Sequence, residues 1–361
     1  METVSMILAL TGGFLGSGKT TAITGACRLL MDKGIQTAVI TNDQGKQQVD
    51  SSLTTSLGIP TAEVAGGCFC CRFEKLRENL QYLMRTVQPE IIFAESVGTC
   101  TDLVATVVKP INQIDPEVRV VVSIFADAAY MKGLMDGSHS FEDENVRYLY
   151  QKQLEEADLI MLNKSDLLSS EQMNDVVTFI GNEYPGKKTE VISSLSREDI
   201  SSWIDLLRDS SITTRPSLDI NYDTYGAGEA ALAWFDKEIE ITSPAQDAIR
   251  VALHAINAIH QQLISRGILI GHLKFFIESP AWSQKISITP TGSSHSLRQP
   301  VPAAERMKML INARVLASPE VLSQIVDGEL EHTIASMNAT IKAYPSAAFA
   351  PGFPRPTHRI A

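Results

Sequence analysis

Short apolar runs alternate with longer stretches of helical periodicity over residues 1–210. An apolar run between turn residues predicts a buried strand, whereas apolar positions three and four apart predict a helix. Strands that alternate with helices are typical of a wound α/β domain with a mainly parallel sheet flanked by helices. The predicted strands are 6–10, 37–41, 63–65, 90–94, 119–125, 158–162 and 190–193, with helices at 21–31 and 74–87 among those between them.

A different order of elements follows residue 228. One long helical pattern with Pro244 near its start, then a run of strands and then a second helix favour a smaller antiparallel α+β domain. The predicted elements are strand 233–241, helix 243–266, strands 271–278, 284–289 and 307–316, and helix 319–337.

Two stretches rich in turn-forming residues mark the limits of these domains. Thr, Pro, Asn, Asp and Gly interrupt the pattern near its middle, which predicts a linker. Pro351, Pro354 and Pro356 crowd the end of the chain, which predicts a loosely held tail. The predicted organisation is an α/β domain over 1–210, a linker over 211–228, an α+β domain over 229–345 and a Pro-rich tail over 346–361.

The composition narrows the class of protein. The chain has 361 residues, 44% hydrophobic and 20% charged, so it can form two globular cores and is neither disordered nor fibrous. Its net charge of -11 argues against general binding to nucleic acids or anionic membranes. No apolar run reaches the roughly 18 residues of a membrane span, and the start of the chain lacks a signal-peptide pattern. We therefore expect a cytoplasmic protein with no nucleic-acid and no membrane partner.

The sequence G-x-x-x-x-G-K-T begins at Gly13, between a predicted strand and a predicted helix. Its glycines let consecutive backbone N–H groups point at one phosphate, at the positive end of the following helix. In this motif the lysine bridges the terminal phosphates and the threonine hydroxyl binds Mg²⁺, so both serve the reaction. The residues predicted to bind the nucleotide here are Gly13, Gly16, Ser17, Gly18, Lys19, Thr20 and Thr21.

The segment Asn163-Lys164-Ser165-Asp166 follows the predicted strand 158–162. In a nucleotide-binding sheet, such an Asp accepts from guanine N1–H and the exocyclic amine, the Asn reads the carbonyl edge, and the Lys stem covers the base. Adenine presents the wrong donors, and an unpaired buried carboxylate is costly. The segment therefore predicts GTP, with Asn163, Lys164 and Asp166 contacting guanine.

Carboxylates at strand ends are candidates for the Mg²⁺ site. Glu95 closes the strand 90–94, where such folds place the acid that holds Mg²⁺ through water or orients the attacking water. Gly98 suits a backbone that approaches the γ-phosphate and moves when it leaves. Asp43 and Asp50 follow the second strand, where a mobile switch with a metal ligand is expected. We predict catalytic roles for Glu95 and Asp43, and Mg²⁺ binding by Thr20, Glu95 and Asp50.

Three of the five cysteines, Cys68, Cys70 and Cys71, lie within four consecutive positions. Thiolates this close can converge on one soft or borderline cation, and three ligands leave a position open for release of the metal. Because thiolates bind only after deprotonation, loading should release protons and weaken in acid. The alternative is a buried turn that serves packing alone. Cys27 and Cys100 are expected to be core thiols.

These motifs, in this order, resemble those of the CobW-type P-loop GTPases. The matching segments are Gly-Gly-Phe-Leu-Gly-Ser-Gly-Lys-Thr-Thr, Gly-Gly-Cys-Phe-Cys-Cys, Glu-Ser-Val-Gly and Asn-Lys-Ser-Asp. The nickel chaperones UreG and HypB and the corrinoid-enzyme chaperone MeaB are relatives of this family. The resemblance implies a P-loop NTPase domain that hydrolyses GTP to GDP and phosphate. It also implies metal insertion, in which Cys68, Cys70 and Cys71 hold the metal and the GTP state controls its transfer.

The chain departs from the family's usual pattern in three respects. Its C-terminal part matches the family's second domain only in the coarse order of elements. The chain has Asn42-Asp43 after the second strand, where the family usually has Asn-Glu, so the carboxylate is shorter. It also lacks the histidine-rich stretch of many members, and its seven scattered histidines are expected to be surface or satisfied residues.

The expected mechanism is a switch. GTP and Mg²⁺ would hold the loops 43–50 and 95–98 in one arrangement, and loss of the γ-phosphate would change how the three sulfurs converge. Zinc or cobalt is the expected metal, with nickel as an alternative. The expected partner is a metal-receiving or corrinoid client protein, and helix 243–266 offers a surface for a homodimer. Two alternatives are a GTPase that gates cofactor loading or repair of a corrinoid enzyme, and a P-loop small-molecule kinase.

Overall fold

The chain divides into two compact units, which we describe separately. The first unit holds the chain up to Gln44, Leu57–Gly228 and Phe353–Ala361, and the second holds Gly45–Ser56 and Glu229–Gly352. The computed structural model describes residues 6–45, 49–139, 141, 143–209, 216–280, 282–293 and 301–361.

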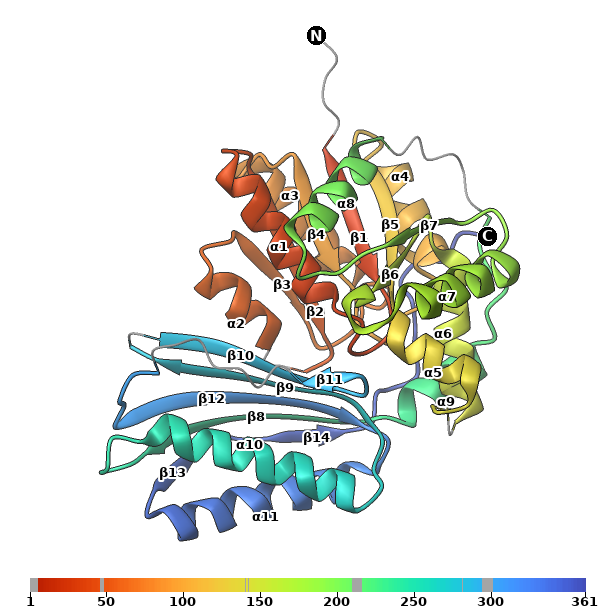
Figure 1. Cartoon of the computed structure of the whole chain (residues 1–361). Coiled ribbons are helices and arrows are strands. Elements are labelled where there is room, and N and C mark those ends of the chain that lie inside the picture. Colours follow the sequence, from red (N-terminus) through yellow and green to blue (C-terminus); the bar gives the residue numbers. More distant parts are fainter. Residues whose placement is uncertain are drawn as a thin grey trace. The chain divides into compact units, whose positions relative to one another are not determined.

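The first unit is built on a seven-stranded sheet in the order β3-β2-β4-β1-β5-β6-β7, and all neighbouring strands are parallel (Figure 1). Both faces of its central strands are buried, because Leu8 and Leu10 are as inaccessible as Ile7 and Ala9. Helices therefore cover both faces, as parallel sheets require. The strands are β1 (Ile7–Gly12), β2 (Thr37–Asp43), β3 (Thr61–Ala65), β4 (Ile91–Glu95), β5 (Arg119–Asp127), β6 (Leu159–Asn163) and β7 (Lys188–Val191).

The helices of this unit follow the strands along the chain. On one face, Trp203 packs against Phe93 and Phe125 of the central strands and joins a cluster with Ile23 and Ala26. The helices are α1 (Lys19–Asp32), α3 (Phe73–Thr86), α4 (Lys109–Ile114), α5 (Ala128–Asp136), α6 (Glu144–Glu156), α7 (Ser170–Glu183), α8 (Arg197–Asp209) and α9 (Tyr222–Ala230), with a π-helical turn η1 (Val104–Val108) and a 3₁₀ turn η2 (Ser165–Leu167).

The second unit is an antiparallel sheet in the order β11-β10-β9-β12-β8-β13, with β14 also paired to β8. Alternate residues of its strands face opposite sides, so Phe275 and Ile311 join the core with the two long helices. Phe276 and Leu310 face the other way and pack against Val49 of a short helix. The elements are α2 (Val49–Ser56), β8 (Ala233–Thr242), α10 (Ala248–Ser265), β9 (Ile270–Ser279), β10 (Trp282–Thr289), β11 (Gly292–Ser293), β12 (Arg306–Val315), α11 (Pro319–Met337), β13 (Thr340–Ala343) and β14 (Ala347–Phe349).

The predicted fold class is confirmed: a parallel α/β domain is followed by a smaller antiparallel α+β domain. The helix predicted over 243–266 is wrong in one boundary, because it begins at Ala248 and not at Ser243. Gln246 has a left-handed backbone with φ 56°, and Ala248 N–H donates to Ala304 O at 3.0 Å, so this stretch bonds to another loop.

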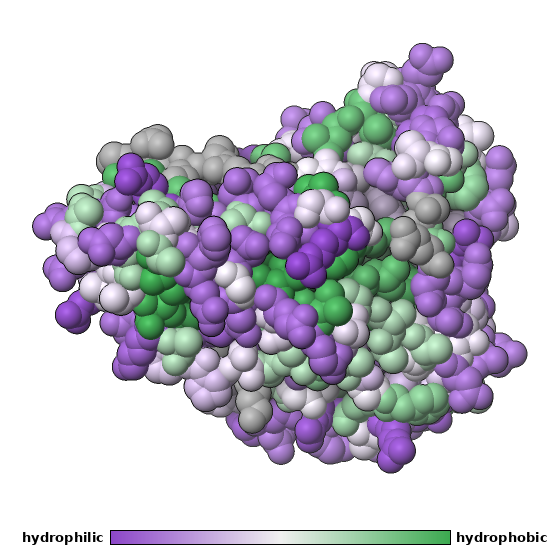
Figure 2. All heavy atoms as spheres, turned by 90° about the horizontal axis from the view of Figure 1, so that it is seen from below, coloured by the Kyte–Doolittle hydropathy of each residue, from purple (hydrophilic) through white to green (hydrophobic). Residues whose placement is uncertain are grey.

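Seen from the side of α11, hydrophilic residues cover much of the surface and interrupt the hydrophobic areas (Figure 2).

The prolines near the end of the chain predicted a loosely held tail, and this prediction is wrong. Residues 353–361 belong to the first unit, and Thr357 N–H donates to Cys70 O at 2.8 Å while Ile360 N–H donates to Ala105 O at 2.9 Å. Prolines keep the backbone extended, and the residues between and after them retain N–H groups that can bond. Part of the predicted linker, 211–215, lies outside the described residues. None of the described helices has the length and hydropathy needed to cross a membrane.

Candidate nucleotide and metal sites

The Gly-rich motif forms a tight loop between β1 and the start of α1. Gly13 has φ 125°, and a Cβ there would collide with Phe125 O on β5. Gly18, at φ 91°, caps α1, and a Cβ there would collide with the Asn163 side chain. Side chains are therefore excluded from this loop by backbone conformation and by close neighbours alike.

The loop has the donors that a phosphate cradle requires. Lys19 Nζ donates to Gly13 O at 2.5 Å and to Phe14 O at 3.1 Å, so its ammonium group lies within the curl of the loop. Ser17 Oγ is buried, and among the described residues it has no hydrogen-bond partner. A buried hydroxyl without a partner is costly, and a phosphate oxygen would satisfy it. The arrangement fits a bound phosphate chain at the N-terminus of α1.

Thr20 and Glu95 are brought together from α1 and β4. Thr20 Oγ1 donates to Glu95 Oε1 at 2.9 Å, and both side chains are buried. A hydroxyl and a carboxylate at this spacing are two oxygen ligands of the kind that Mg²⁺ uses beside a nucleotide. Bound there, Mg²⁺ would neutralise charge on the β- and γ-phosphates. Asp43 lies at the end of β2, half-buried, and its predicted catalytic role stays a prediction.

Asn163 joins the cradle to the loop after β7. Its Nδ2 donates to Ser17 O at 2.7 Å, and its Oδ1 accepts from Ser194 N and Ser194 Oγ, both at 2.8 Å. These bonds position the two loops that would enclose a base. Asn163 therefore has a positioning function in the structure, and its predicted contact with guanine stays a prediction.

Lys164 and Asp166 follow Asn163 next to this junction. Lys164 has a left-handed backbone, and its Nζ is held by Asp127 Oδ2 at 2.6 Å. Asp166 is exposed and accepts from Ser193 Oγ at 2.6 Å. An exposed carboxylate aligned by a serine can accept from the guanine edge, as the motif predicts.

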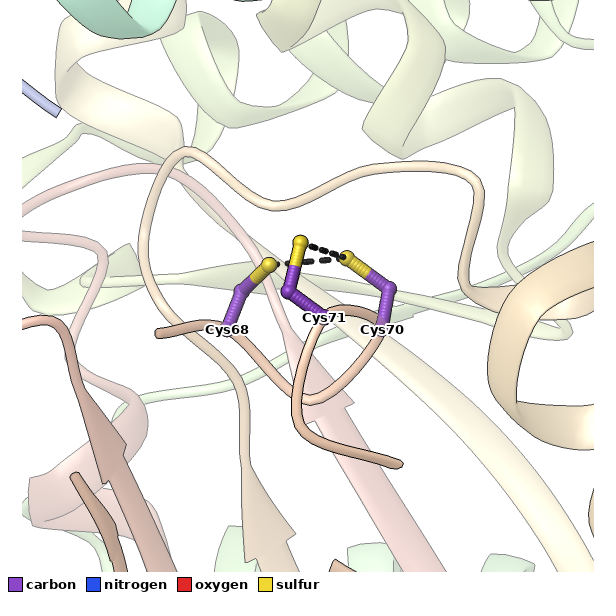
Figure 3. Close-up of side chains that lie close together, drawn as sticks. All are labelled: Cys68, Cys70 and Cys71. Atoms are coloured by element: carbon purple, nitrogen blue, oxygen red, sulfur yellow. Dashed lines mark hydrogen bonds between the residues drawn. The ribbon is translucent and has the colours of Figure 1, made fainter. Parts of the chain in front are cut away.

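The sulfur atoms of Cys68, Cys70 and Cys71 converge on one point (Figure 3). The Cys68 and Cys70 sulfurs are 2.7 Å apart, those of Cys70 and Cys71 are 3.8 Å apart, and all three lie within 4.8 Å of one another. Left-handed Gly66 and Gly67 open the loop after β3, and Arg72 N–H donates to Cys68 O at 2.9 Å. The resulting turn directs the thiols to one side, so the three sulfurs could hold a metal ion.

Interactions with neighbouring thiols and burial raise the pKa of all three thiols of this loop. A hydrogen bond with Cys100, together with burial, raises the pKa of Cys68 and raises that of Cys70 well above its ordinary value. A hydrogen bond with Cys68, together with burial, raises the pKa of Cys71. A raised thiol pKa favours the protonated form, which a metal would have to displace, and the predicted weakening of metal binding in acid stays a prediction.

Asn42, at the end of β2, anchors the cysteine loop. Its Nδ2 donates to Gly67 O at 2.7 Å and to Val64 O at 3.0 Å, and its Oδ1 accepts from Phe69 N at 3.0 Å. The loop therefore depends on the residue that precedes Asp43. Hydrogen bonds therefore connect the cysteine loop to the end of β2.

Asp50 lies in α2, within the second unit. Its two oxygens pair with Lys274 Nζ at 2.6 Å and Lys285 Nζ at 2.7 Å. Burial would raise the pKa of Asp50, but the two ammonium groups outweigh it and hold the pKa well below its ordinary value. The structure thus uses Asp50 to anchor α2, and its predicted contribution to Mg²⁺ binding stays a prediction.

Comparison with protein families agrees with this geometry. A model of the family described as CobW/HypB/UreG, nucleotide-binding domain, matches residues 7–189, just over half of the chain. The chain belongs to the CobW/HypB/UreG family. The resemblance inferred from the motifs is confirmed, and the first unit of this family member contains a nucleotide-binding domain.

Individual relatives match mainly this domain of the CobW/HypB/UreG family. The zinc chaperone YeiR of Escherichia coli K12 is 29% identical over 45% of this chain and 47% of its own. The zinc chaperone CobW of a Sinorhizobium species is 28% identical over 50% of this chain and 56% of its own. The zinc-regulated GTPase metalloprotein activator 1 of Dictyostelium discoideum is 28% identical over 47% of this chain and 42% of its own. The chain therefore spans about half the length of the curated relatives it matches.

Sequence reasoning missed several residues of the sites in this CobW/HypB/UreG family chain. Asp127 and Asn42 were overlooked, although both stand at the carboxyl ends of strands, where open α/β sheets bind ligands. Cys100, predicted to be a core thiol, is fully buried, and its interaction with Cys68 and Cys70 raises the pKa of both thiols.

Proposed function

We propose that this protein is a GTP-hydrolysing metallochaperone that binds a divalent transition metal through Cys68, Cys70 and Cys71. The nucleotide state would control how tightly the three thiolates hold the metal, and a client protein would receive it. The observation that carries the proposal is the convergence of the three sulfurs on a loop hydrogen-bonded to Asn42, beside the strand ends that serve the nucleotide.

The chemistry of the donor set favours zinc or cobalt. Thiolates suit soft and borderline cations, and the relatives whose names are zinc chaperone support zinc as the first metal to test. In this proposal Lys19 holds the terminal phosphates, while Thr20 and Glu95 supply oxygens for Mg²⁺. The metal is the cargo that the protein binds and gives up.

A titration of zinc into the GDP-loaded and the GTP-analogue-loaded protein tests the proposal. We expect the two nucleotide states to differ in zinc affinity, and a Cys68→Ser, Cys70→Ser, Cys71→Ser variant to lose high-affinity binding while it retains nucleotide. Equal affinity in the two states would remove the coupling. Competition between ATP and GTP separates the proposal from a small-molecule kinase, because we expect Asp166 to select guanine over adenine.

A further inference from the structure

Two polar side chains lie on the buried face of α6. Gln153 and Glu156 are buried together with the apolar residues of this helix, which are Val146, Leu149, Tyr150 and Leu154. A buried polar group without a hydrogen bond is costly, so the partners of these two side chains show what the helix positions. Both side chains bond to the segment 98–104, which follows β4.

The Gln153 amide holds two carbonyl groups of this segment. Its Nε2 donates to Gly98 O at 3.0 Å and to Cys100 O at 2.9 Å. Cys100 N–H also donates to Val97 O at 3.0 Å, which closes a turn at the same place. The side chain of α6 therefore sets the course of the backbone soon after it leaves the strand.

Glu156 binds the far end of the segment, one helical turn further along α6. Its Oε2 accepts from Leu103 N at 2.6 Å and from Val104 N at 3.4 Å. Its Oε1 accepts from Thr101 Oγ1 at 3.2 Å. The first N–H groups of a helix have no partner within it, and here the carboxylate satisfies those at the start of η1. The segment is thus held at both ends by side chains of α6.

The held backbone lies directly against the phosphate cradle. A Cβ on Gly98 would lie 2.6 Å from Leu15 Cδ2 and 3.2 Å from Leu15 N, so a side chain at this position has no room. The end of β4 is tied to the cradle as well, because Thr20 Oγ1 donates to Glu95 Oε1 at 2.9 Å. The bond from Gln153 to Gly98 O therefore determines where this peptide stands relative to the cradle.

The segment is held in a costly arrangement. Asp102 has a left-handed backbone with φ 63°, which is unfavourable for a residue with a side chain. Among the residues that the structure describes, the buried atoms Asp102 Oδ1 and Gln153 Oε1 have no hydrogen-bond partner, and each such atom costs free energy. An arrangement of this kind persists only where its neighbours enforce it, so a change in the bound phosphate can shift it.

We propose that Gln153 is a positioning residue for GTP hydrolysis. Through Gly98 O it holds the loop after β4 in the arrangement that the terminal phosphate requires, without touching the nucleotide itself. The inference rests on the proposed function, because it takes the phosphates to lie in the cradle beside Lys19 and Thr20. It deepens that function by naming a residue outside the cradle that sets the rate of hydrolysis.

The decisive comparison is between Gln153→Met and Gln151→Met. Methionine keeps the length of the side chain and favours a helix, but it has no N–H donor, so the two carbonyls lose their partner. Gln151 is exposed on the same helix, which makes the same substitution there the matched control. We expect Gln153→Met to lower kcat for GTP at least about tenfold, because a misplacement of ~1 Å can cost ~100-fold in rate. Its GDP affinity should stay close to that of the wild-type chain, because GDP lacks the terminal phosphate.

The outcomes separate positioning from a general structural role and from the metal proposal. A Gln153→Met protein that keeps the kcat of the wild-type chain overturns the inference, and so does one that loses kcat and GDP affinity to the same degree. Equal zinc affinity of the wild-type chain in both nucleotide states would remove the coupling to the metal and leave this inference standing. A wild-type chain that hydrolyses no GTP would remove both.

Hydrogen exchange of the wild-type protein provides a test that needs no variant and applies even if Gln153→Met does not fold. The backbone amides of 97–104 should exchange more slowly with a GTP analogue bound than with GDP bound, because the terminal phosphate favours the held arrangement. Equal exchange of this segment in the two states would overturn the inference.

Discussion

Asn42 shows how one residue can connect two sites. Its amide makes three hydrogen bonds to the segment Val64–Phe69, and its neighbour Asp43 ends the strand beside the predicted nucleotide switch. The bonds reach across the β2–β3 pair, whose register places Asn42 opposite Val64. Residues that orient ligands are worth almost as much to a metal site as the ligands themselves.

We predict that Asn42→Ala lowers zinc affinity about tenfold, because the cysteine loop loses its anchor while the thiols remain. Nucleotide affinity should stay close to that of the wild-type chain. Asn79→Ala is the matched control, since its amide donates at 2.9 Å to Glu63 O on the same strand and not to the cysteine loop. Unchanged zinc affinity in Asn42→Ala would show that the loop is held without this residue.

At the scale of elements, the C-terminal segment 353–361 acts as a strap over the cysteine loop. Arg355 N–H donates to Cys71 Sγ at 3.2 Å, and Thr357 N–H donates to Cys70 O at 2.8 Å. The strap is fastened by Arg359, whose Nε pairs at 2.8 Å with the buried Asp102. An N–H group directed at a thiolate stabilises its charge, so the strap would favour the proposed binding of a metal by Cys71.

We predict that Arg359→Ala speeds the transfer of bound zinc to a chelator about fivefold, as a net loss of about 1 kcal/mol from its hydrogen bonds to Asp102 and Leu218 O would do. The measurement is a stopped-flow transfer assay. Arg355→Ala is the control, because its N–H to Cys71 does not depend on the side chain. Identical release rates for the wild-type and Arg359→Ala proteins would contradict the role assigned to the strap.

At the scale of the molecule, the chain passes between its two units more than once. It leaves the first unit after Gln44, contributes α2 to the second, and returns at Leu57. α2 is held there by the Asp50 ion pairs and by Val49 N–H, which donates to Asn312 Oδ1 at 2.9 Å. The segment after the predicted switch residue Asp43 is therefore part of the second unit's fold.

We predict that Asp50→Asn destabilises the second unit by about 2 kcal/mol at neutral pH, between the values typical of exposed and of buried ion pairs. Because the pKa of Asp50 is depressed on folding, its contribution is present above the unfolded pKa of about 3.9 and is lost as the pH falls through the folded pKa. The difference between the two proteins should therefore shrink in acid.

Calorimetry across the pH range checks this prediction, with a GTP analogue added to identify the transition of the first unit. Arg250→Ala, which removes an exposed ion pair of the same unit, is the control and should have little effect. If the Asp50→Asn protein is as stable as the wild-type chain at neutral pH, Asp50 does not anchor α2.

The sequence could predict whatever depends on close neighbours along the chain. The cradle at Gly13–Thr20 needs only its glycines and the following helix, and the thiols of Cys68, Cys70 and Cys71 converge because one turn holds them all. The order of strands and helices likewise followed from apolar periodicity, because each strand or helix carries in its own sequence the apolar residues that it buries. These features determined the fold class, the family and the nature of both predicted sites.

Only the tertiary structure decided which distant residues complete the sites. Asn42 reaches Gly67 and Asp50 reaches Lys274, each through the pairing of strands or the packing of a helix on a sheet. Strand order in a parallel sheet differs from chain order, so the loops that meet at its carboxyl edge cannot be read from spacing. The sequence could not predict these distant partners, because non-local contacts form only when the whole sheet is assembled and its faces are buried.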